Sequence, residues 1–210
     1  MLAPRPDHFA YLDHAASTPM HPEAVEAMLP FLSDRYANPS GAHAMARDAR
    51  RAVDEARDTV AECLGCEPGE VVFTGSGTEA DNLAITGLLA RTGGTAVCTA
   101  VEHHAVLHPV EHSGGKTLAV DARGVVDMAA LADALNPDVR VVSVMLVNNE
   151  VGTIQPLDEV AAVVAECAPG AALHTDAVQA VTWLDIQSAA TPAAMVSIAG
   201  HKFGGPKGVG

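Results

Sequence analysis

Apolar positions recur along the chain with two different periods, and each period predicts one kind of element. Segments with an apolar residue at every third or fourth position predict amphipathic helices, and short continuous apolar runs predict strands covered on both faces of a sheet. The expected helices span residues 21–32, 44–64, 78–91, 104–112, 126–135 and 157–167. The expected strands span residues 70–74, 95–99, 116–120, 140–147, 171–175 and 195–199.

The order of these elements predicts the fold class. Helices and strands alternate through most of the chain, which is typical of an α/β fold with a mostly parallel sheet and helices on both faces. Ligands of such sheets bind beyond the carboxyl ends of the strands. Residues that directly follow a predicted strand are therefore the candidates for a functional site.

Composition and charge indicate a globular domain and exclude some classes of binding partner. Of the 210 residues, 49% are hydrophobic and 18% are charged, which suits one large globular domain, alone or with a piece of another. The formal net charge of −14 argues against nucleic acid or an anionic membrane surface as the main partner. No segment has the roughly 20 apolar residues of a membrane span, and the N-terminus lacks the apolar core of a signal peptide. A cytoplasmic location is the expectation.

The four cysteines do not form a recognisable metal or redox framework. Cys63 and Cys66 have C-x-x-C spacing, but they stand at the end of a predicted helix, whereas a thioredoxin-type pair opens a helix after a strand. Cys98 and Cys167 form no second pair with the spacing of a zinc ribbon. Buried free thiols are the preferred interpretation, and a redox or metal role for Cys63 and Cys66 is the alternative.

A lysine follows the last predicted strand. Lys202 stands between His201 and a glycine-rich segment, and it is one of only three lysines in the chain. A partly desolvated lysine has a neutral amine that attacks carbonyl groups, so Lys202 is placed to hold an aldehyde cofactor as a Schiff base. An exposed loop lysine is the alternative interpretation.

A glycine-rich turn lies between the first predicted strand and the helix after it. In Gly75-Ser76-Gly77-Thr78 the backbone lets an anion approach, and the N–H groups and dipole of the following helix favour a phosphate. The sequence matches neither the Walker loop nor the dinucleotide-binding fingerprint. A plain glycine turn with Thr78 as the helix cap is the alternative.

Polar side chains follow three further strands. His103 follows strand 95–99, and a histidine there stacks on a planar ring or transfers protons. Asn149 follows strand 140–147 and offers an uncharged amide to an oxygen substituent. Asp176 follows strand 171–175, where a protonated pyridine nitrogen would be a fitting partner for a carboxylate that is costly to bury alone. Gln179 lies within reach of an oxygen on the same ring.

Each of these signals has a simpler interpretation when taken alone. Glu102, His104 and His108 could join His103 as metal ligands, but the chain lacks the H-E-x-x-H spacing, and we expect no metal centre. An Asn-rich turn would explain Asn149. In combination, however, a phosphate cradle, a ring-stacking histidine, amides, a carboxylate and a lysine are the groups that pyridoxal 5'-phosphate requires.

The motifs as a set resemble those of the cysteine desulfurases, a branch of the class V aminotransferase group within the fold type I pyridoxal-phosphate enzymes. The resemblance runs nearly from end to end. The motifs that carry it are Tyr11–Pro19, Asn38–His43, Phe73–Asn82, Glu102-His103, Asn148–Gly152, Gly200–Lys202 and Gly205–Gly208.

The resemblance implies a role for each candidate residue. Lys202 would bind the cofactor covalently and shuttle protons, and His103 would stack on the ring. Asp176 would pair with the pyridine nitrogen. The remaining cofactor contacts, to the phosphate, the phenolic oxygen and the substrate side, would come from Gly77, Thr78, His201, Asn149 and Gln179.

The resemblance also implies an activity and partners. A cysteine desulfurase converts L-cysteine to L-alanine and passes the sulfur, as a persulfide, to an acceptor protein for iron-sulfur cluster or thio-cofactor biosynthesis. The family's enzymes are homodimers. Another class V enzyme, such as a selenocysteine lyase or an aminotransferase-like relative, and a non-catalytic scaffold remain the alternatives.

Two departures from the family pattern affect these expectations. Ala199 occupies a position where a serine or threonine commonly binds the phosphate. In the family, the nucleophilic cysteine and the arginine that binds the substrate carboxylate lie well after the lysine segment, and this sequence ends before both. We therefore expect a truncated chain that releases no sulfur by itself. The expected organisation is a segment over residues 1–20, belonging with a small domain or the entrance of the cofactor site, and a pyridoxal-phosphate-binding large domain over 21–210, incomplete at its C-terminus.

Overall fold

The computed structural model describes residues 10–210, so the first nine residues of the expected segment 1–20 lie outside the described part. Its centre is a five-stranded sheet of order β2-β1-β3-β4-β5 in which every neighbouring pair is parallel. The strands are β1 (Thr95–Thr99), β2 (Lys116–Leu118), β3 (Val139–Ser143), β4 (Ala172–Asp176) and β5 (Met195–Ser197). The predicted parallel α/β class is therefore confirmed.

Helices cover both faces of this sheet because successive strand residues point to opposite sides. On β1, Ala96 and Cys98 join one apolar core, whereas Val97 joins the other. The first core is covered by α5 (His104–His112) and by a continuous helical stretch made of α3 (Gly77–Asn82), a π-turn (Leu83–Gly87) and α4 (Leu88–Thr92). The second, larger core is covered by α6 (Met128–Ala134), α7 (Leu157–Cys167) and the short α8 (Ile186–Ala189).

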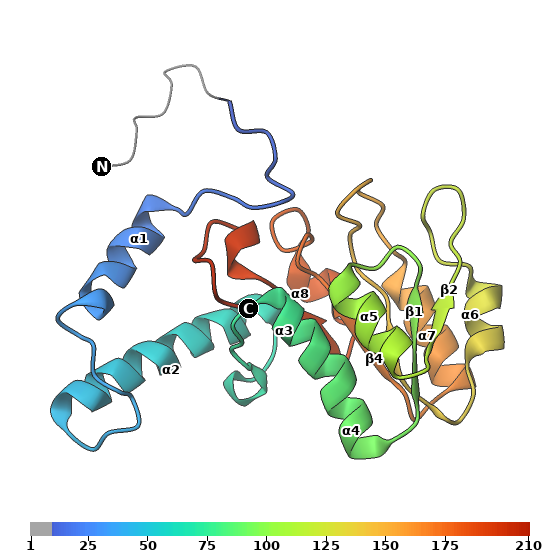
Figure 1. Ribbon diagram of the computed structural model, residues 1–210, viewed down its shortest axis with the longest axis horizontal. Coiled ribbons are helices and arrows are strands. Elements are labelled where there is room, and N and C mark those ends of the chain that lie inside the picture. Colours follow the sequence, from blue (N-terminus) through green and yellow to red (C-terminus); the bar gives the residue numbers. More distant parts are fainter. Residues whose placement is uncertain (1–9) are drawn as a thin grey trace.

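The N-terminal helices extend away from the sheet (Figure 1). They are α1 (Pro22–Met28), which continues as a 3-10 turn (Leu29–Leu32), and the long α2 (Ala44–Leu64). The buried residues of α2 are three alanines, so this helix makes little apolar contact with the rest of the described chain. None of the helices in residues 10–210 combines the length and the apolar character that a membrane crossing needs.

Two of the predicted strands differ most from the structure, and those over 116–120 and 195–199 each end two residues earlier than predicted. Residues 70–74 were expected to form a strand, but Pro68–Glu70 form a 3-10 turn, and Thr74 exchanges its two backbone hydrogen bonds with Gly210, at 2.7 and 3.0 Å. One such pair does not make a strand. The strand predicted over 140–147 ends at Ser143, although the N–H groups of Val144 and Leu146 still donate to the carbonyl oxygens of His174 and Asp176 on β4, at 3.0 and 2.9 Å. On the other side of this segment the Met145 N–H donates to the Glu102 carboxylate at 2.8 Å, so a side chain takes the place of β1 there.

Candidate active site

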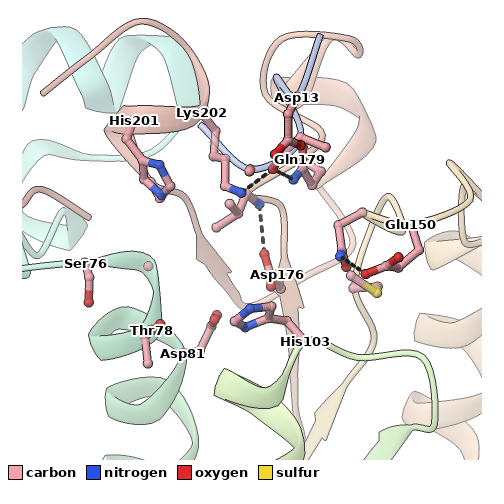
Figure 2. Close-up of a pocket in the computed structure, with 17 residues that line it drawn as sticks. Asp13, Ser76, Thr78, Asp81, His103, Glu150, Asp176, Gln179, His201 and Lys202 are labelled. Carbon is pink, nitrogen blue, oxygen red and sulfur yellow. Dashed lines mark hydrogen bonds between the residues drawn. The ribbon is translucent and has the colours of Figure 1, made fainter. Parts of the chain in front are cut away.

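The carboxyl ends of the strands surround a cavity of about 560 Å³. Because the strands are parallel, the residues that follow them emerge at one edge of the sheet. Figure 2 shows the side chains that converge there. All eight residues that the sequence singled out line this cavity: Gly77, Thr78, His103, Asn149, Asp176, Gln179, His201 and Lys202. The structure thus brings them together, while their individual roles remain predictions.

Lys202 reaches the cavity from a 3-10 turn (Gly200–Lys202) that follows β5. Its Nζ donates a hydrogen bond to the carbonyl oxygen of Ala15, which also accepts from Gln179 Nε2 at 2.7 Å. Partial burial lowers the pKa of the Lys202 amine, and the carboxylates of Asp176 and Asp13 offset part of that shift. The amine is therefore more easily neutral than that of an exposed lysine.

The segment before α1 fastens the lysine turn in place. Thr18 donates to the carbonyl oxygen of His201 from both its backbone N–H and its hydroxyl, each at 2.9 Å. The same hydroxyl accepts from the Gly204 N–H at 2.8 Å. Asp13, Ala15 and Ala16 line the cavity itself.

The glycine turn before α3 forms the opposite wall. Ser76 caps the helix, since its hydroxyl accepts from the Glu79 N–H at 3.1 Å, so the alternative in which Thr78 is the cap is wrong. A Cβ on Gly77 would lie 3.1 Å from both Ala199 Cβ and Val178 Cγ2. Ala199 is thus packed against the turn where the family pattern has a hydroxyl, and the hydroxyls of Ser76 and Thr78 are those that line the cavity.

Asp176 and His103 lie at the floor of the cavity (Figure 2). Asp176 Oδ1 accepts the Val178 N–H at 2.9 Å. Burial raises the pKa of the Asp176 carboxyl, against the lowering effect of that hydrogen bond and of His103 and Lys202. His103 caps α5, with Nδ1 accepting from the Ala105 N–H at 3.1 Å, which fixes the ring orientation and places the proton of the neutral ring on Nε2.

The turn after β3 is organised by Asn148. Its Oδ1 accepts the N–H groups of Glu150 and Val151, at 2.9 and 3.0 Å, and its Nδ2 donates to the Val101 carbonyl at 3.0 Å. Asn148 is therefore committed to the fold. Asn149 is the amide of this turn that lines the cavity.

The structure also places Glu102 and the four cysteines. Glu102 is buried and accepts from the Thr99 hydroxyl at 2.7 Å as well as from Met145, so its role is structural. In the described part of the chain no group of three or more ligand side chains is placed to hold a metal ion. The four cysteines are free thiols, but only Cys98 is buried and Cys63 is exposed, which corrects the expectation that they are all buried.

Sequence reasoning missed Asp81. This residue of α3 is almost fully buried, lines the cavity, and has its Oδ1 3.6 Å from His174 Nε2. The available signal was its spacing, because Asp81 lies four residues after Gly77 and thus on the same face of the helix.

Fold and site together define an α/β protein whose lysine-bearing cavity lies at the carboxyl edge of a parallel sheet. The family model of Aminotransferase class-V matches residues 10–210, and the chain belongs to this family.

Its relatives are cysteine desulfurases. The chain is 48% identical to the IscS-like cysteine desulfurase of Mycobacterium tuberculosis, over 96% of this chain and 54% of the relative. It is 42% identical to cysteine desulfurase IscS of Dictyoglomus turgidum, over 95% of this chain and 52% of the relative. The chain therefore spans about half the length of the curated relatives it matches.

Solved structures have the same fold as this chain. One described as SspA in complex with cysteine superposes with a TM-score of 0.87 at 37% identity, covering 95% of this chain and 59% of the other. DndA from Streptomyces lividans superposes with a TM-score of 0.75 at 36% identity, covering 95% and 57%. These likenesses confirm the predicted large-domain fold.

Proposed function

We propose that this chain is the cofactor-binding part of a pyridoxal-phosphate-dependent cysteine desulfurase. The observation that carries the proposal is that Lys202, Asp176 and the Gly77 turn, which come from three distant segments, line one cavity. The names of the relatives, and the complex of one structural neighbour with cysteine, support L-cysteine as the substrate.

The residues present fit pyridoxal phosphate. A Cβ at Gly77 would lie 3.1 Å from Ala199 Cβ and Val178 Cγ2, so glycine lets the turn pack closely against two other residues that line the cavity. Asp176 supplies a buried carboxylate for a protonated ring nitrogen. Lys202 lines the same cavity, and the pKa of its amine is lowered. The cavity volume of about 560 Å³ is in the range of small-molecule sites.

The bound cofactor would supply an electron sink for the carbanion chemistry of an amino acid. The chain's own residues would hold and orient it. Gly77, Thr78 and His201 bind the phosphate, and Asp176 keeps a proton on the ring nitrogen. The fixed ring of His103 presents a flat face for stacking.

Proton handling would fall to the amine of Lys202. Its partial desolvation lets Nζ alternate between charged and neutral forms near neutral pH more easily than an exposed lysine. Asn149 and Gln179 orient the ring oxygen and the substrate side. None of the four cysteines lines the cavity. The roles proposed for the residues that do line it are therefore cofactor binding and proton transfer.

The overall reaction would convert L-cysteine and an acceptor thiol into L-alanine and a persulfide. We further propose a homodimer, a sulfur-acceptor protein partner and a cytoplasmic location. Leu29, Leu32 and Tyr36, all exposed near α1, support association through this side of the molecule. We also propose that residues 21–210 form the large domain. Of the predicted segment 1–20, residues 10–20 would lie at the entrance of the cofactor site, which the position of Asp13, Ala15 and Ala16 supports.

The test is the stoichiometry of products from L-cysteine in the full-length protein with pyridoxal phosphate and a thiol reductant. We expect alanine and sulfide in equal amounts, well above the background of free pyridoxal phosphate. A protein that binds pyridoxal phosphate but forms neither product would contradict desulfurase activity and favour another class V reaction.

A further inference from the structure

A row of polar side chains crosses the sheet beneath the cavity floor. His174 of β4 lies between two serines, with Nδ1 2.8 Å from Ser143 Oγ on β3 and Nε2 2.9 Å from Ser197 Oγ on β5. Strand register places Ser143 directly beside His174, whereas Ser197 is the cross-strand partner of Asp176, which lies two residues further along β4 and on the same face of the sheet. All three side chains of the row are buried, and both ring nitrogens of His174 have partners.

Asp81 lies against this row from α3. Its Oδ1 is 3.6 Å from His174 Nε2, too far for a hydrogen bond, and this buried oxygen has no hydrogen-bond partner in the described part of the chain. Burial lowers the pKa of His174 to about 4, so the ring is neutral at neutral pH and gives Asp81 no counter-charge.

A second carboxyl shares the same space. Asp81 and Asp176 both line the cavity, and both point into its lower part beside His103 (Figure 2). Two buried carboxyls that share one cavity do not both ionise without a large cost. Asp176 accepts the Val178 N–H and lies in the field of His103 and Lys202, whereas the Ser197 hydroxyl is the group that favours ionised Asp81. Asp176 therefore has the stronger stabilisation of its charge.

We propose that Asp81 is a positioning residue that holds a proton at neutral pH, so that Asp176 alone carries the negative charge at the cavity floor. Ionisation of Asp81 then opposes binding of an anionic cofactor, and Asp81 sets the alkaline limit of cofactor binding. The identity of the cofactor rests on the proposed function, whereas the protonation state of Asp81 does not.

The electrostatics of the surroundings agree with this assignment. Burial, and then the negative charge of Asp176, raise the pKa of Asp81 to about 8, against the lowering effect of the Ser197 hydroxyl. The titratable groups that surround Asp81 are Glu79 on its own helix, His174 and Asp176 on β4, Glu102 and His103 before α5, and Lys202 after β5. Glu102 is a buried acid whose pKa burial also raises to about 8, so it adds no second charge at neutral pH.

The position of Asp81 gives the direction of the effect. Asp81 lies one helical turn after Gly77 and lines the same cavity as Gly77 and Thr78, the residues proposed to bind the phosphate. An ionised Asp81 would repel both that phosphate and the Asp176 carboxylate. Its attraction to the protonated ring nitrogen of the cofactor would offset only part of this repulsion. Cofactor affinity is therefore expected to fall as the pH rises through the pKa of Asp81.

The first measurement needs no cofactor. Carboxyl carbon shifts of the full-length, cofactor-free protein, assigned through the backbone, report each aspartate separately. We expect the Asp81 carboxyl to be protonated at pH 7 and to lose its proton with a pKa of about 8. An Asp81 carboxyl that is ionised at neutral pH overturns the proposal, and this reading requires no variant that might misfold.

The second measurement is the pH dependence of binding of pyridoxamine 5'-phosphate, which lacks the aldehyde and so cannot bond to Lys202. With a pKa of about 8 for Asp81, affinity for the wild type should fall about tenfold from about pH 7 to about pH 9. Asp81→Asn, a neutral and isosteric replacement, should keep the affinity at pH 7 and lose most of the alkaline fall.

Asp127→Asn is the matched control, because the same substitution at the N-cap of α6 lies outside the cavity and keeps a good capping residue. It should retain the alkaline fall. An unchanged pH dependence in Asp81→Asn contradicts the proposal. A wild type that binds no pyridoxamine phosphate at any pH contradicts the proposed function instead, while the carboxyl titration still decides the state of Asp81.

Discussion

The amine of Lys202 donates a hydrogen bond to the carbonyl oxygen of Ala15, a residue 187 positions earlier in the chain. The proposed catalytic lysine is therefore positioned by the segment before α1 as well as by its own strand. Thr18 strengthens this connection through its three hydrogen bonds to His201 and Gly204. Covalent binding of a cofactor would require the Lys202 amine to leave Ala15, so the surrounding contacts must hold the turn without this bond.

Thr18→Ala tests this connection. The substitution removes two side-chain hydrogen bonds and leaves the Gly204 N–H unpaired, which should weaken cofactor binding by about 1–3 kcal/mol. Titration with pyridoxal phosphate measures the loss. Thr18→Ser retains the hydroxyl and should bind nearly as the wild type does. Equal losses in both variants would show that the methyl group, and not the hydroxyl, matters.

Gly77→Ala tests the glycine turn. The added Cβ would press on Ala199 and Val178 at 3.1 Å, and overpacking of this kind costs about 1–3 kcal/mol. We expect weaker binding of pyridoxal phosphate. The double variant Gly77→Ala with Ala199→Gly removes one of the two contacts and should recover part of the affinity. Additive losses in the double variant would contradict the packing argument.

Glu102→Gln tests the buried carboxyl behind β3. Burial raises the pKa of Glu102 from 4.5 to about 8. An acid with a raised folded-state pKa contributes stability that is complete below its unfolded pKa and is lost as the pH rises through the folded pKa. The wild type should therefore lose stability between about pH 4.5 and pH 8, and Glu102→Gln should lose less of it, as measured by urea unfolding across that range.

Glu166→Gln, on the exposed side of α7, is the control for this pH profile. It should follow the wild-type curve. Parallel curves for the wild type and Glu102→Gln would mean that Glu102 is ionised in the folded protein throughout the range.

Asp176→Asn tests the electronic role of the carboxylate. An amide does not carry the negative charge that keeps a ring nitrogen protonated, so alanine formation from cysteine should slow on the order of 100-fold, the scale of losing one preorganised electrostatic contact. Bound cofactor should persist, because the lysine and the phosphate contacts remain. Wild-type turnover in Asp176→Asn would refute the role.

Local signals explain which elements were predictable from the sequence. The limits of the helices 44–64, 104–112 and 157–167 agree with α2, α5 and α7. Helix α2 ends at Gly65, which adopts the left-handed backbone conformation. A glycine directly after a helical pattern is a signal for a helix end. His103, Asn149, Asp176 and Lys202 follow strands of one parallel sheet, so the topology predicts that they meet at one edge, whereas Gly77 and Thr78 reach this edge without a strand before them.

What the sequence did not reveal depends on contacts between distant residues. Thr74 pairs with Gly210, and the Met145 N–H after β3 donates to the side chain of Glu102, 43 residues earlier. The spacing of Asp81 from Gly77 indicates its helix face, but its burial results from the packing of α3 over β4 and β5, which the local sequence does not show. Such effects are decided by tertiary structure, which overrides local preference.

The central claim is that Lys202 binds the cofactor. The most direct measurement is borohydride reduction of the full-length protein loaded with pyridoxal phosphate, followed by peptide mapping of the pyridoxyl group. We predict that the label lies on Lys202, whose amine opens to the cavity and has a lowered pKa. A label on Lys207 or Lys116, or no label on a protein that binds the cofactor, would contradict the account.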